Sequence, residues 1–118
     1  MTKGQVEALL SEAISKFEIE HMGRGPERIK THILKDLIII RLQGFLTVSE
    51  KKLAERAEGV HLVREVRAAL FECSRDNLIQ AIKSVIDIEV VSIFSDIGFE
   101  SGEKIIAITV NKNIEEII

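Results

Sequence analysis

The stretch RIKTHILKDLIIIRLQ, residues 28–43, decides the fold. It contains two runs rich in β-branched and apolar residues, separated by Lys35-Asp36. Pairing the runs as an antiparallel hairpin sets Ile33 opposite Ile38 and leaves one face almost wholly apolar. A buried apolar face is what fixes the register of paired strands. The sequence therefore predicts a β-hairpin with strands over 28–34 and 37–43.

A second hairpin is predicted near the C-terminus, with strands over 87–97 and 104–110 joined by a glycine-containing loop. Its pairing again places apolar side chains on a single face. The predicted facing pairs are Ile97 with Lys104, Ile93 with Ile108, and Val91 with Val110.

Helical periodicity fills the remaining chain. A first helix is predicted over 3–22, with Thr2 and Gln5 forming a capping box and Gly23 as the stop. Thr47 and Glu50 form a second capping box, which opens a short helix to about Ala57, and Glu58-Gly59 breaks it. A long helix then follows over 60–85. Its predicted buried stripe consists of Leu62, Val63, Val66, Leu70, Cys73, Asn77, Ala81 and Val85.

The predicted order, α-β-β-α-α-β-β, describes two helix-plus-β-hairpin units in a single α+β domain, residues 1–118, with an antiparallel sheet packed on helices. The tail 111–118 is predicted as either a frayed turn or a docking segment. The predicted core contains Ile33, Ile38, Ile40, Ile93, Ile106 and Ile108 together with Leu10, Phe17, Val66 and Leu70.

Composition narrows the class of protein. The 118 residues carry a net charge of −3, so bulk affinity for nucleic acid or an anionic membrane is not expected. No apolar run approaches the roughly 18 residues of a membrane span, and the N-terminus opens directly into an amphipathic helix, so we expect a cytoplasmic protein without membrane insertion. The single cysteine, Cys73, lies on an apolar stripe and is predicted to be a core residue.

The second faces of the two hairpins carry the most informative pattern. In the first hairpin four cationic or ionisable side chains share this face: Arg28, Lys30, His32 and Arg41. The register places Lys30 directly opposite Arg41, where like charges destabilise a sheet unless an anion, an acidic partner or solvent compensates. We therefore predict that this face holds either a small anion or metabolite, or an acidic residue from the chain or its dimer mate.

Apolar side chains also populate this second face, including Leu37 and Ile39 in the first hairpin and Phe94 and Ile105 in the second. Such a face is too apolar to lie open to water if the hairpins share one sheet. Either the sheet is covered on both sides, or the protein is a homodimer packed face to face. No metal or cofactor is predicted, because the histidines and Cys73 lack ligand spacing and no phosphate-binding glycine loop is present.

Several short motifs resemble the MpsC-like family, formerly a domain of unknown function. The resemblance covers nearly the whole chain. It rests on the Gly23-Arg24-Gly25-Pro26 turn, the Arg41-Leu42-Gln43-Gly44 hairpin end, the Leu46-Thr47-x-x-Glu50 helix start, Arg67 on the long helix and Asp96 in the second hairpin. The resemblance implies association with a bacterial sodium-dependent, membrane-potential-generating system connected with inorganic carbon uptake. It implies no catalytic residues, and turn, cap and salt-bridge roles explain the motif positions.

Taken together, these patterns predict a cytoplasmic, homodimeric, non-enzymatic accessory or regulatory domain. Its protein partner would belong to a membrane ion or inorganic-carbon transport system. An anion or metabolite sensor that uses the basic face of the first hairpin is the first alternative. An enzyme without a recognisable motif is the second.

Overall fold

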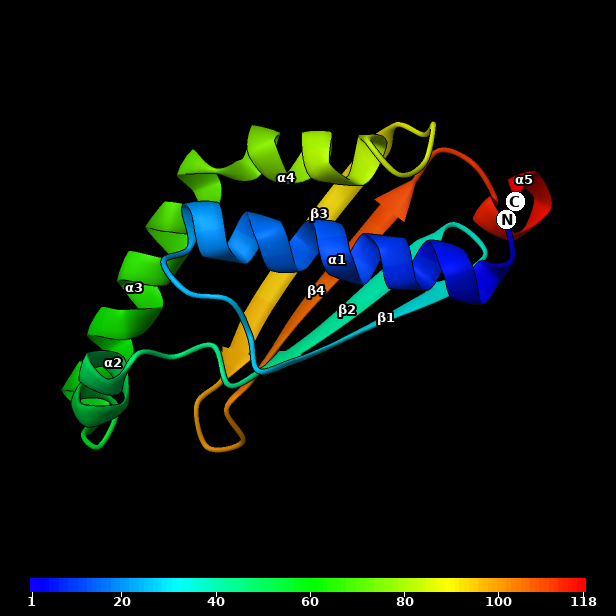
Figure 1. Ribbon diagram of the computed structural model, residues 1–118. Helices are drawn as coiled ribbons and strands as arrows, with labels where there is room; N and C mark the ends of the chain where they lie inside the picture. Colours follow the sequence, from blue (N-terminus) through cyan, green and yellow to red (C-terminus); the bar gives the residue numbers. More distant parts are fainter.

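The computed structural model describes all residues, Met1–Ile118, and contains five helices and four strands. Figure 1 shows their arrangement. In chain order they are α1 (Lys3–His21), β1 (Arg28–Leu34), β2 (Leu37–Gln43), α2 (Val48–Leu53), α3 (Ala57–Cys73), α4 (Arg75–Lys83), β3 (Val90–Gly98), β4 (Glu103–Val110) and α5 (Ile114–Ile117).

The four strands form one antiparallel sheet in the order β1-β2-β4-β3, which joins the two hairpins through β2 and β4. The predicted register of the first hairpin is confirmed, with Ile33 opposite Ile38 and Lys30 opposite Arg41. In the second hairpin Ile93 pairs with Ile108 as predicted. The α+β fold class is therefore confirmed, and both hairpins contribute to a single sheet.

One predicted pair is wrong. Val90, not Val91, lies opposite Val110, because an irregularity between Val90 and Ser92 shifts the register of β3. The extra residue turns Val91 outward, and 63% of its surface is exposed. A bulge of this kind inserts one residue into one strand only, so strict alternation fails to predict side-chain direction beyond it.

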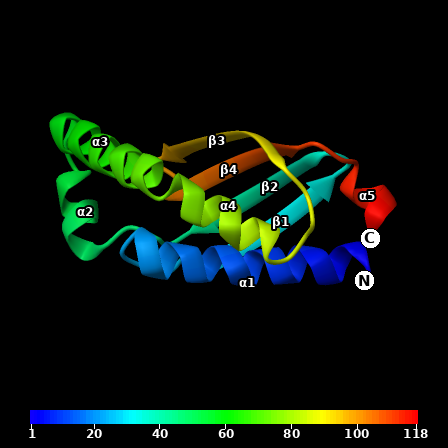
Figure 2. The same cartoon turned by 90° about the horizontal axis from the view of Figure 1, so that it is seen from above.

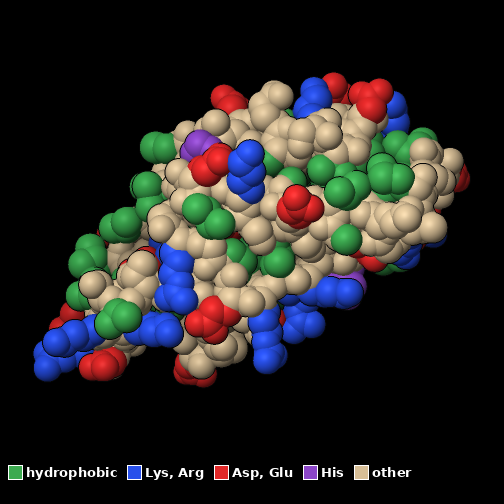
Figure 3. All heavy atoms as spheres, viewed as in Figure 1, with side chains coloured by type: hydrophobic (Ala, Val, Ile, Leu, Met, Phe, Trp, Pro, Cys, Tyr) green, Lys and Arg blue, Asp and Glu red, His purple; other side chains and the backbone are tan.

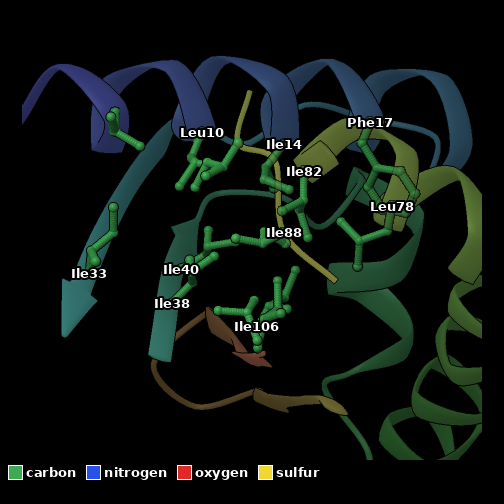
Figure 4. Packing of buried hydrophobic residues seen from close by; sticks show 14 of the residues in the cluster. Leu10, Ile14, Phe17, Ile33, Ile38, Ile40, Leu78, Ile82, Ile88 and Ile106 are labelled. Carbon is green, nitrogen blue, oxygen red and sulfur yellow. The ribbon is translucent and has the colours of Figure 1, made fainter. Parts of the chain in front are cut away.

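The helices cover only one face of the sheet (Figures 1 and 2). There α1 lies beside α4, and α1 also packs on β1. Figure 4 shows Leu10 and Ile14 of α1 pointing toward the side on which Ile38, Ile40 and Ile106 of the sheet lie, whereas Phe17 lies beside Leu78 of α4. These side chains are at most 2% exposed and belong to the main hydrophobic core.

The edge strand β1 is closed by side chains of α1. The carboxylate of Glu7 accepts a hydrogen bond from the backbone N–H of Ile33 at 2.8 Å, and the hydroxyls of Ser11 and Thr31 lie 2.7 Å apart. Such contacts use up edge groups that would otherwise pair with another strand. The tail proves to be a docking segment, because α5 contacts β1 and Ile114 is fully buried.

The predicted long helix is interrupted at Ser74, and this break is a correction to the sequence-based expectation. A straight helix over 60–85 would run about 39 Å, longer than strands of this length. The break lets α4 lie across the sheet beside α1, while α3 continues past the β3 edge (Figure 2).

The buried side of α3 also differs from the predicted stripe. The buried residues are Gly59, Val63, Arg67 and Phe71, whereas Leu62, Val66 and Leu70 are 39–51% exposed and Cys73 is exposed. Val66, Leu70 and Cys73 are therefore not core residues. Figure 3 shows hydrophobic side chains gathered along the outer side of α3.

The break predicted at Glu58-Gly59, between the short helix and the long one, falls earlier, because α2 ends at Leu53 and Gly59 lies inside α3. A Cβ atom at this position would lie 1.6 Å from the carbonyl oxygen of Leu53 in α2, a distance that no packing allows. Glycine at this position is therefore what allows α2 and α3 to approach each other.

Candidate functional site

The predicted basic residues lie on the face of the sheet that no helix covers. We call this the open face; its four cross-strand rows are Leu34-Leu37-Thr109-Ser92, His32-Ile39-Ala107-Phe94, Lys30-Arg41-Ile105-Asp96 and Arg28-Gln43-Glu103-Gly98. None of these residues is buried, whereas Ile33, Ile38, Ile40, Ile106 and Ile108 on the opposite face are at most 2% exposed.

A hollow of about 600 Å³ brings together three of the four predicted anion-binding residues, Arg28, Lys30 and Arg41. His32 does not line it, because His32 lies in the neighbouring row. The compensating charge for Lys30 beside Arg41 comes from the chain itself. The carboxylate of Glu103 accepts hydrogen bonds from Arg41 Nε at 3.1 Å and from Nη2 at 2.8 Å. The like-charge pair therefore does not require an external anion.

The charges of the open face are segregated between its two halves. The hairpin β1–β2 contributes the cationic side chains of Arg28, Lys30 and Arg41, together with His32. The hairpin β3–β4 contributes only carboxylates, Asp96 and Glu103. The two halves meet where Arg41 pairs with Glu103, whereas Ile105 lies between Arg41 and Asp96. Apolar side chains are also exposed on this face, and Phe94, Leu34 and Ile105 are 63%, 58% and 40% exposed. A surface with two oppositely charged halves and exposed apolar side chains can complement a second copy of itself.

Among the family-motif positions, Arg41 and Asp96 lie on the open face, whereas the motif residues around Gly23 and Glu50 hold loops together away from it. Gly23 has φ +96°, which the turn after α1 requires and which glycine adopts without strain. Arg24 Nη1 donates to the carbonyl oxygen of Leu46 at 2.8 Å, so the turn is tied to the loop before α2. Gly25 lies against Ile19, where a Cβ atom would approach a side-chain carbon to 2.8 Å. Pro26 then fixes the exit from this turn.

Glu50 has two roles. Its carboxylate accepts a hydrogen bond from the backbone N–H of Thr47 and completes the predicted capping box of α2. The same carboxylate accepts two hydrogen bonds from the guanidinium of Arg67, at 2.7 and 2.8 Å. Partial burial by itself raises the pKa of the Glu50 carboxyl. The hydrogen bonds from Arg67 and Thr47 and the positive charge of Arg67 outweigh this effect and hold the pKa below its ordinary 4.5.

Arg67 is a residue of α3 and is only 3% exposed. Its side chain reaches the loop before α2. Besides Glu50, its Nη2 donates to the carbonyl oxygen of Phe45 at 3.2 Å, and its guanidinium carbon lies 5.0 Å from the centroid of the Phe45 ring. Its Nη1 is buried and has no hydrogen-bond partner. An unsatisfied buried donor costs free energy, so this atom needs an explanation beyond the Glu50 pair.

Sequence reasoning missed a second buried ion pair. Lys104 Nζ on β4 lies 3.2 Å from the carboxylate of Glu18 on α1, and the two residues are 2% and 0% exposed. Nζ also lies 5.2 Å from the centroid of the Phe71 ring. Burial lowers the pKa of Lys104 below its ordinary 10.5, Glu18 opposes this in part, and the charge of Arg67 adds to the lowering.

Both buried cations line a cleft of about 380 Å³ between α3 and the strands β3 and β4. Asp96 lies on its wall and is paired with Arg64 of α3, which gives this family-motif position a partner. The lining residues are Arg64, Arg67, Ala68, Phe71, Glu72, Ile93, Phe94, Ser95, Asp96, Ile97 and Lys104. A cleft of this volume is large enough for a small metabolite. Nothing in the sequence pattern pointed to it, because α3 was expected to turn a different side inward.

No group of three or more His, Cys, Asp or Glu side chains is arranged to hold a metal ion. No helix is both long enough and apolar enough to cross a bilayer.

Comparison with known proteins places this arrangement in a family. Residues 2–112 match the family described as "Na+-translocating membrane potential-generating system (MpsC)". The chain is 31% identical over 121 residues to "Uncharacterized protein YbcI" of Bacillus subtilis (strain 168), covering 99% of this chain and 98% of that protein. It is 27% identical over 107 residues to "Uncharacterized protein YrhF" of the same organism, covering 90% and 88%. No solved structure matches. The chain therefore belongs to the MpsC family.

Proposed function

We propose that this protein is a cytoplasmic, non-enzymatic accessory domain that acts as a homodimer joined through the open face. The observation that carries the proposal is the charge segregation of that face. Its accessory role would lie in a sodium-translocating, membrane-potential-generating system, in line with the description of its family.

The apolar residues of the open face supply the reason for association. Phe94, Leu34 and Ile105 are among the exposed large hydrophobic residues, and Leu37 and Ile39 between them are only partly covered. Burying apolar surface contributes roughly 25 cal/mol per Å² removed from water. A sheet that is covered on one side by its own helices can bury its other side only against another molecule.

The charges select the arrangement of the two copies. A two-fold axis parallel to the strands, between β2 and β4, would stack β1 on the partner's β3 and β2 on the partner's β4. Lys30 of each copy would then face the Asp96 position of the other, and His32 would face the Phe94 position. An axis perpendicular to the strands would instead stack the cationic half on the partner's cationic half, which like charges disfavour.

Light scattering on matched variants tests the proposal. Ile39→Lys places a charge at the centre of the open face, and we expect it to convert a dimer into a folded monomer. Val48→Lys is the control, because Val48 is 81% exposed on α2, away from the open face. We expect the control to remain dimeric. A wild-type monomer at micromolar concentration, or a dimer that Ile39→Lys leaves intact, would contradict the proposal.

A further inference from the structure

The cleft between α3 and β3 has a polar floor and apolar walls. Arg67 and Lys104, which are 3% and 2% exposed, bring two cationic groups to it from different elements. Phe71, Ile93 and Phe94 supply apolar surface. Ligand sites commonly combine a largely apolar lining with a few fixed polar groups.

Arg67 lines this cleft and has one side-chain donor, Nη1, that no hydrogen bond uses. Its Nε and Nη2 are bonded to Glu50 and to the carbonyl oxygen of Phe45, which fixes the guanidinium plane. Its Nη1 is buried and has no partner. A guanidinium held in this way is pre-oriented, so an acceptor that reaches Nη1 gains a charge-assisted hydrogen bond without ordering the side chain first.

We infer that this cleft binds a small organic anion, with its oxyanion head on Nη1 of Arg67 and its apolar body against Phe71 and Ile93. The head is a carboxylate or a phosphate. This site goes beyond the proposed dimer and is built from residues of one chain, although Phe94 and Asp96 at its edge also belong to the open face. It differs from the predicted basic hollow, because none of Arg28, Lys30, His32 or Arg41 lines it.

The surroundings favour an anion over a neutral acceptor. The positive charge of Arg67 contributes to lowering the pKa of Lys104, so each buried cation feels the other. Glu50 and Glu18 offset part of this repulsion, and a negative head bound to Arg67 would offset more of it. The cleft is also lined by side chains that reach the surface, since Arg64 has 45% of its side-chain surface exposed and Phe94 is 63% exposed.

A titration followed by NMR tests the site with three probes. Benzoate and phenyl phosphate carry the two oxyanion heads on an aromatic body, and benzamide is the neutral counterpart of benzoate. We expect at least one of the two anions to give saturable shifts with a Kd of about 1 mM or tighter, including a shift of the Arg67 Nε–H signal in the wild-type protein. Benzamide should bind at least about tenfold more weakly.

A pair of neighbouring substitutions on α3 supplies the matched control. Ala68 lines the cleft and Ala69 does not, although both are exposed on the same helix. Ala68→Phe should fill the cleft and weaken binding by about tenfold or more, whereas Ala69→Phe should leave it unchanged. The monomeric Ile39→Lys variant should still bind, because its substitution lies outside the cleft.

Three results would overturn the inference. The first is the absence of saturable binding by both anions up to about 10 mM. The second is equal binding of benzamide and benzoate. The third is binding that survives Ala68→Phe while the Arg67 signal stays unmoved. Because the Arg67 signal is read in the wild-type protein, the test does not depend on any variant folding.

Discussion

The two faces of the sheet are built from the same strands but are completed differently. On the covered face, side chains such as Ile40 and Ile106 are fully buried under α1 and α4 of the same chain. On the open face, their neighbours Ile39 and Ile105 stay partly or largely exposed. The covered face is closed by apolar packing and a single internal ion pair, Glu18–Lys104. The open face carries its cationic side chains on one hairpin and its carboxylates on the other, with one pair, Arg41–Glu103, where the hairpins meet. This division is why we expect its complement to be a second copy.

Breaking the Glu18–Lys104 ion pair of the covered face should change the free energy of unfolding more than any other single substitution considered. Lys104→Met leaves the fully buried carboxylate of Glu18 without a partner, so we expect a loss of about 3–5 kcal/mol in the free energy of unfolding. The double variant Glu18→Leu with Lys104→Met should recover most of this loss, because it removes both charges. Urea denaturation measures both effects. A loss below about 1 kcal/mol for Lys104→Met would mean that the pair is not buried as described.

Ile39 and Ile40 are adjacent residues of β2 whose side chains lie on opposite faces of the sheet, so substitutions of the two compare the faces directly. Ile40→Ala creates a cavity in the core and should cost about 2–5 kcal/mol. Ile39→Ala, on the open face, should cost about 1 kcal/mol or less in the monomer, because its side chain is already partly in water. Urea denaturation, at a protein concentration too low for dimers to form, would measure the loss of stability in each of the two variants. Equal losses would show that the two faces are not distinct.

The stability of the folded protein should also change with pH, by a smaller amount. Because the pKa of Lys104 is lower in the folded protein than its ordinary 10.5, the unfolded chain binds more protons between these two values. The stability of the wild type should therefore rise with pH in that window, relative to the Glu18→Leu/Lys104→Met double variant. Denaturation curves from about pH 8 to 10.5 would measure this difference. If the stability of the wild type relative to the double variant falls with pH, the pKa of Lys104 is not lowered in the folded protein.

Apart from the irregularity at Val91, strand pairing was predictable because the chosen register gathers most isoleucines of each hairpin on one face, with Ile39 and Ile105 as the exceptions. The ion pair Glu18–Lys104 was missed, although a signal existed. Glu18 follows Val6, Leu10 and Ile14 at intervals of four on the buried side of α1, and Lys104 alternates with buried Ile106 on β4. Two opposite charges at inward positions could have been paired from sequence alone.

The orientation of α3 was not predictable from hydrophobic periodicity. Its apolar stripe through Leu62, Val66 and Leu70 is exposed, while Arg67 is buried. Arg67 turns inward because Glu50 and the carbonyl of Phe45, both far away in the sequence, satisfy its donors. The motif residues Arg24, Glu50, Arg67 and Asp96 were predicted to have structural roles, and each has a specific partner. The cleft beside α3 follows from tertiary contacts that no local pattern encodes.

Chemical cross-linking between two separately purified variants tests the proposed dimer most directly. In a Cys73→Ser background, one variant carries Lys30→Cys and the other carries Asp96→Cys. Within one chain these positions lie on strands β1 and β3, roughly 14 Å apart across the sheet, beyond the reach of a short thiol-reactive linker. We predict that mixing the two variants gives a covalent dimer, whereas each variant alone gives none. Cross-linking of the Lys30→Cys variant with itself, or no covalent dimer from the mixture, would contradict the arrangement.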